Sequence, residues 1–72
     1  MKERQVSSSL MRILYEKINS IDNPVRRLHY TQGAIDALLA NNNYFRARHL
    51  LFLHRLIDKA MELAHSRNEI VY

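Results

Sequence analysis

Residues 44–66 read YFRARHLLFLHRLIDKAMELAHS and carry the clearest structural pattern in the chain. Their apolar members recur at steps of three and four, which is the period of one face of an α-helix. No proline or glycine interrupts this period. The spacing therefore predicts a helix over 44–66, whose main apolar seam consists of Leu50, Leu53, Ile57, Ala60 and Ala64.

A second apolar row lies beside this seam on the same predicted helix. It consists of Phe52, Leu56 and Leu63, which are again separated by helical steps. The two rows together span an arc much wider than the roughly 100° that a surface helix buries. Such an arc is covered either by two short companion helices in a three-helix bundle or, in part, by a second copy of the chain. Of these alternatives we favour the second copy, and we predict a homodimer.

Two further helices are predicted upstream, on either side of the strongest boundary signal in the chain. Asn23 is a favourable helix cap, and Pro24 suits the first helical position because an amide there has no partner. These residues divide a helix over about 8–21 from one over 24–40. Three asparagines at 41–43 form a turn that is too short for anything but an antiparallel neighbour. We predict an all-α fold, a three-helix antiparallel bundle in up-down-up order.

Length and composition are those of one small domain. The chain has 72 residues, which is near the lower limit for a self-sufficient core, and it has no cysteine for disulfide bonds. We predict a single helical domain over 1–72, with flexible ends at 1–6 and 68–72. The sequence shows neither a secretory signal nor an apolar run of about 20 residues. We therefore expect no membrane span and a cytoplasmic location.

Residue patterns typical of catalysis or metal binding are absent from the sequence. His49 and His54 are five positions apart, whereas the histidine pair of a zinc-binding helix is four apart. The chain also lacks a cysteine nucleophile, a glycine-rich phosphate loop and a paired carboxylate motif. We expect no enzymatic activity, no metal ion and no cofactor.

Arginines and apolar residues on the predicted helix over 44–66 are the best candidates for a binding surface. Arginine beside aromatic side chains is a common composition of protein interfaces. We therefore expect a small protein–protein interaction module, such as a bacterial or phage adaptor, regulator or chaperone-like protein. Its partners would be itself and a protein with an acidic or apolar groove. The predicted contact residues are Arg46, Arg48, His49, Phe52, Arg55 and Leu56.

The positive charge of the chain leaves a second hypothesis open. The net charge is +4, and an antiparallel bundle brings Lys2 and Arg4 to the same end as Arg46 and Arg48. Phosphate groups bind such basic clusters, and the bases of single strands stack on aromatic rings such as that of Tyr44. The alternative function is therefore that of a nucleic-acid-binding regulator, which would use this Arg-rich end.

Overall fold

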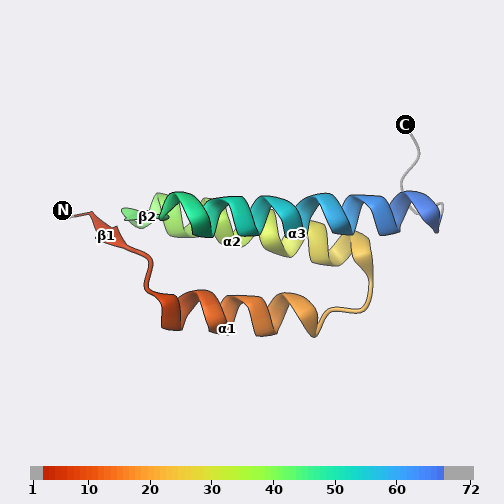
Figure 1. The fold of residues 1–72 in the computed structure, drawn as a ribbon, viewed down its shortest axis with the longest axis horizontal. Coiled ribbons are helices and arrows are strands. Elements are labelled where there is room, and N and C mark those ends of the chain that lie inside the picture. Colours follow the sequence, from red (N-terminus) through yellow and green to blue (C-terminus); the bar gives the residue numbers. More distant parts are fainter. Residues whose placement is uncertain (1–2, 68–72) are drawn as a thin grey trace.

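The computed structural model describes residues 3–67, and this part of the chain is mostly helical (Figure 1). Its helices are α1 (Ser8–Asn19), α2 (Pro24–Ala40) and α3 (Ala47–Ser66). Two strands of two residues each, β1 (Arg4–Gln5) and β2 (Asn43–Tyr44), pair in parallel. The predicted three-helix all-α fold is confirmed, with the addition of one small strand pair that we did not predict.

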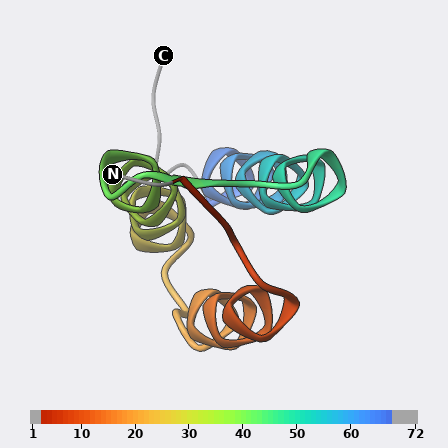
Figure 2. The same cartoon turned by 90° about the vertical axis from the view of Figure 1, so that its left-hand side faces the viewer.

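The three helices are arranged as a close pair with the third helix on one side. α2 and α3 make the most extensive contact of any two elements and lie side by side (Figure 1). Seen end-on, α1 lies below that pair, so the three helices mark the corners of a triangle (Figure 2). α1 has 12 residues and α3 has 20. At about 1.5 Å per residue, α1 is too short to cover the whole length of α3.

Side-chain caps fix the positions at which the first two helices begin. The Ser7 hydroxyl oxygen accepts a hydrogen bond from the Leu10 amide at 3.1 Å. The Asn23 Oδ1 atom accepts hydrogen bonds from the amides of Val25 at 2.9 Å and Arg26 at 3.1 Å. These bonds satisfy amides that the first turn of a helix leaves without a backbone partner. The cap predicted at Asn23 is therefore confirmed.

The third helix begins later than the sequence pattern indicates. α3 starts at Ala47 and not at Tyr44, because Asn43 and Tyr44 are extended and form β2. Asn42 has a φ of 61°, a left-handed conformation that asparagine tolerates, and it turns the chain from α2 into this strand. The first helix also differs from the prediction, since it ends at Asn19 and not at residue 21. The predicted bounds hold for α2 alone.

The amino-terminal segment has a defined structure where we predicted flexibility. The amides of Arg4 and Val6 donate hydrogen bonds of 2.8 Å to the carbonyl oxygens of Asn42 and Tyr44, respectively. The Val6 side chain is only 1% exposed and belongs to the apolar core. The prediction of a flexible end over 1–6 is therefore wrong for residues 4–6. Residues 1–2 and the predicted flexible end at 68–72 lie outside the described residues.

One apolar cluster joins the amino-terminal segment to all three helices. The Ile18 side chain of α1 and the Leu53 side chain of α3 are fully buried in this cluster. Ile35 of α2 also belongs to it and is 9% exposed. Burial of such side chains is the main favourable term in folding. The complete buried cluster comprises Val6, Met11, Leu14, Ile18, Ile35 and Leu53.

A single arginine joins the loop that follows α1 to α2. The Nε and Nη2 atoms of Arg27 donate hydrogen bonds to the carbonyl oxygen of Ile21 at 3.0 and 2.7 Å. The buried Thr31 hydroxyl in turn donates a hydrogen bond to the carbonyl oxygen of Arg27 at 2.7 Å. The strand pair holds the segment before α1, and this guanidinium contact holds the loop after it.

Candidate functional site

The six predicted contact residues divide into an exposed and an inward-facing group. Arg46, Arg48, Phe52 and Arg55 are exposed. His49 and Leu56 are half-buried, and Leu56 packs against the apolar cluster. The structure therefore brings four of the six residues to the surface and turns the other two toward the interior.

Three of the exposed residues belong to one stripe along α3. Arg48, Phe52 and Arg55 are separated by four and three positions, so they lie above one another on a single helix face. Lys59, four positions further on, is also exposed and extends the same face. We call these four residues the basic–aromatic stripe. Within residues 3–67, its three cationic side chains make no ion pair. The helical spacing alone is sufficient to identify Lys59, which we did not predict.

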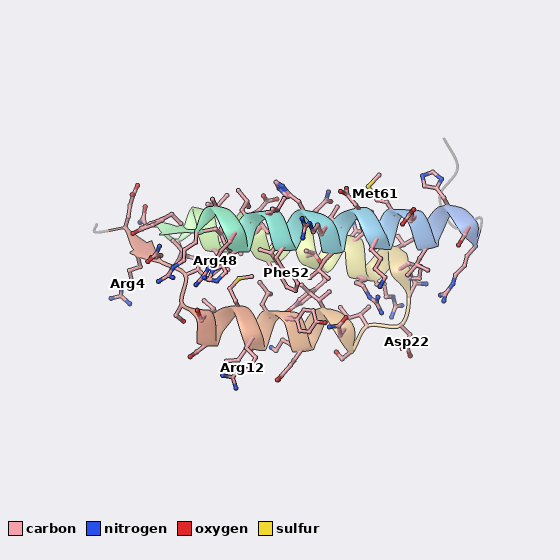
Figure 3. All side chains as sticks on the ribbon, in the orientation of Figure 1. Arg4, Arg12, Asp22, Arg48, Phe52 and Met61 are labelled. Atoms are coloured by element: carbon pink, nitrogen blue, oxygen red, sulfur yellow. The ribbon has the colours of Figure 1, made fainter. Side chains whose placement is uncertain are left out.

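The aromatic ring of the stripe rests partly on the first helix. The ring centroids of Phe52 and Tyr15 are 5.2 Å apart and their planes are inclined by 43°. This geometry lies within the range of favourable aromatic pairs. Figure 3 shows Phe52 projecting from α3 toward α1. The Phe52 side chain is still 39% exposed, so α1 supports one side of the ring and leaves the rest open.

Leu51 borders the stripe and adds a second exposed apolar side chain. It lies three positions after Arg48 and four before Arg55, and its side chain is 53% exposed. Neither Leu51 nor Tyr15 was among the predicted contact residues. The position of Tyr15 depends on where α1 packs against α3, which helical periodicity does not determine. Leu51, by contrast, lies on the side opposite the buried seam and is detectable from its spacing.

Basic residues also gather where the chain enters α3. Strand pairing places Arg4 opposite Asn43, next to the exposed Tyr44. Arg46 is the N-cap residue of α3, and its side chain forms no capping hydrogen bond. The first turn of α3 contains no acidic residue. Figure 3 shows Arg4 and Arg48 at the same end of the molecule. This basic end therefore has a positive helix terminus with no carboxylate in that turn.

The described residues show neither a metal-binding cluster nor a helix suited to a bilayer. Within residues 3–67, no three histidine, cysteine, aspartate or glutamate side chains lie close enough together to hold a metal ion. The buried Nδ1 atom of His49 has no hydrogen-bond partner among these residues. In the same part of the chain, no helix combines the length and the apolar character that crossing a bilayer requires.

A groove separates α2 from α3 on one side of their contact. It has a volume of about 490 Å³ and is lined by Gln32, Ile35 and Asp36 from α2 and by His54 and Ile57 from α3. Ile57 packs against the apolar cluster, whereas Gln32, Asp36 and His54 are exposed. The groove thus has an apolar floor and polar rims.

Comparison with protein-family models, with curated proteins and with solved structures found no match to this chain.

Proposed function

We propose that this protein is a non-enzymatic protein–protein interaction module whose basic–aromatic stripe binds an acidic, amphipathic segment of another protein. The bundle runs in up-down-up order and forms a homodimer. The observation that supports this proposal most directly is the exposure of Phe52 among three cations that are unpaired within the described residues. A surface of this composition suits a partner that presents apolar side chains flanked by carboxylates.

The two kinds of side chain in the stripe have different roles in this proposal. Phe52 is the apolar anchor, because aromatic residues near the centre of an interface contribute a large share of the binding energy. Tyr15 limits the rotation of the Phe52 ring before a partner arrives, which lowers the entropy lost on binding. Arg48, Arg55 and Lys59 surround the anchor and steer an acidic partner, which mainly raises the association rate.

Replacing Phe52 with glutamate should weaken binding of the partner at least about tenfold while the helices remain intact. The change places a carboxylate at the centre of the stripe, where it repels an acidic partner and removes the apolar anchor. We expect capture of specific proteins from a lysate of the source organism to fall at least about tenfold, which is a modest effect for a central anchor residue. Circular dichroism should show an unchanged helical content, because the Phe52 side chain is already 39% exposed.

The matched control is Ile13→Glu, which introduces the same charge on α1. Ile13 is 52% exposed and lies outside the stripe. This variant should capture the same proteins as the wild-type chain. Equal capture by the Phe52→Glu and wild-type chains would contradict the proposed function.

The basic end supports a second candidate function, the binding of nucleic acid. Arg4, Arg46 and Arg48 are exposed at this end together with Tyr44. A protein that neutralises several phosphates with such residues loses affinity steeply as the salt concentration rises, because counterions are released on binding.

A gel-shift titration at several salt concentrations tests this alternative. Nucleic-acid binding predicts retardation of a DNA or RNA fragment by micromolar protein at low salt, with a log–log salt slope of about −2 to −3 for three phosphate contacts. The double variant Arg46→Ala/Arg48→Ala should make the slope shallower by about two. No retardation of either nucleic acid at low salt would rule out the alternative and leave the protein-binding function in place.

A further inference from the structure

The groove between α2 and α3 opens on the side of the pair that faces away from α1. His54 is two positions from Phe52, and a helix turns by about 100° per residue, so their side chains point in nearly opposite directions. Phe52 contacts Tyr15 of α1. On α2, Asp36 is likewise two positions from Ala34, which packs against the apolar cluster. Figure 2 shows α1 on one side of the α2–α3 pair, so the groove lies on the other side.

The two walls of the groove carry complementary polar groups around an apolar floor. The α2 wall presents the Asp36 carboxylate and the α3 wall presents the His54 imidazole. Both side chains are exposed, and within residues 3–67 neither makes a hydrogen bond or an ion pair. Leu39 continues the α2 wall three positions beyond Asp36, and its side chain is 51% exposed. An occupant of the groove must therefore supply apolar atoms in the middle, a donor for Asp36 and an acceptor for His54.

We propose that the occupant is the same groove of a second copy of this chain. This inference rests on the homodimer in the proposed function. It places the dimer interface in the groove, and not on the row of Phe52, Leu56 and Leu63 from which a second copy was predicted.

A two-fold axis that runs along the groove, parallel to the helices, places α2 of each copy against α3 of the other. Asp36 of each copy then faces His54 of the second copy, and Ile35 of each copy faces Ile57 of the second copy between these polar pairs. The two-fold axis forms the contact between Asp36 and His54 twice, once from each copy, as an interface with this symmetry requires.

The geometry of the helix pair favours this occupant over an unrelated helix. α2 and α3 run in opposite directions (Figure 1), so a two-fold axis parallel to them makes every neighbouring pair of the four helices antiparallel. Alternating antiparallel helices are the standard arrangement of a four-helix bundle. A chain of 72 residues without cysteine also has a small core of its own, which association enlarges. The basic–aromatic stripe lies outside this interface and stays free for the other protein.

Charge reversal on the two walls tests the interface. Sedimentation velocity at low salt should show a dimer for the wild-type chain. Asp36→Lys and His54→Glu should each weaken the dimer by about tenfold, because each creates two like-charge or unmatched contacts per dimer. The double variant Asp36→Lys/His54→Glu should restore most of the lost affinity, since the introduced ammonium group of one copy then faces the introduced carboxylate of the other. Glu16→Lys and Arg12→Glu are the matched controls on exposed positions of α1 and should leave the dimer unchanged.

The outcomes separate this inference from the proposed function. A monomeric wild-type chain at all accessible concentrations overturns the inference together with the homodimer of the proposed function. A double variant that dimerises no better than either single variant overturns the inference alone. Unchanged dimer affinity in both single variants also overturns it. None of these results affects capture by the stripe, which the comparison of Phe52→Glu with Ile13→Glu measures separately. Conversely, Phe52→Glu should remain a dimer even when it no longer captures a protein.

Discussion

Leu53→Ala should lower the free energy of unfolding by about 3 kcal/mol, the largest loss of stability that we expect from one truncation in this chain. The Leu53 side chain is 0% exposed and belongs to the cluster that joins α1, α2 and α3. Its removal loses the transfer free energy of the buried methyl groups and leaves a cavity that the three helices fill only in part. For a domain of this size, such a loss lowers the melting temperature by more than about 10 °C.

A nearby leucine, Leu51, is a close control for this prediction. Leu51 lies on the same helix, two positions away, but its side chain is 53% exposed. Leu51→Ala should change the free energy of unfolding by less than about 0.5 kcal/mol. Both variants remove the same atoms and introduce the same helix former, so urea denaturation of the pair isolates the effect of burial. Equal losses in the two variants would show that α3 packs in a different orientation.

Val6→Asp should detach the amino-terminal segment and destabilise α1. The Val6 side chain is 1% exposed, and a carboxylate in its place has no partner among the core residues. Burying an unpaired charge costs several kcal/mol, which is more than the strand pair contributes, so the segment should leave the core instead. We expect a loss of about 2 kcal/mol or more in the free energy of unfolding.

Hydrogen exchange locates the effect of this substitution. The amides of residues 4 and 6, which donate to the carbonyl oxygens of Asn42 and Tyr44 in the wild-type chain, should lose their protection. Gln5→Asp adds the same charge to the neighbouring position, where the side chain is exposed, and should keep both amides protected. Protection that survives in Val6→Asp would contradict the role of Val6 as an anchor.

Local sequence signals were sufficient to predict most of the helical structure. Asn23 and Pro24 cap and start α2 through contacts within a few residues, so no knowledge of the rest of the chain is needed. The predicted start of α3 is wrong because it depends on a contact with a distant part of the chain. Tyr44 continues an apolar helical period, but its backbone pairs with Gln5, a residue far away in sequence. A tertiary contact of this kind overrides local helix propensity and has no signature in a short window.

The candidate surface was predictable to a similar extent. Helical spacing places Arg48, Phe52 and Arg55 on one face of α3 whatever else the fold contains. It does not reveal which neighbouring face α1 covers. Leu56 was therefore expected as an exposed anchor although it packs against the core, and the contact of Tyr15 with Phe52 was missed. Both errors concern the packing angle between helices, which depends on several distant residues at once.

The contacts on both sides of α1 affect how this helix unfolds. A helix with a free end unwinds gradually from that end, one turn at a time. Here β1 pairs with β2 before α1, and Arg27 bonds the carbonyl oxygen of Ile21 after it. Because both flanking segments are tied to the rest of the fold, we expect α1 to separate from the other two helices in a single concerted event.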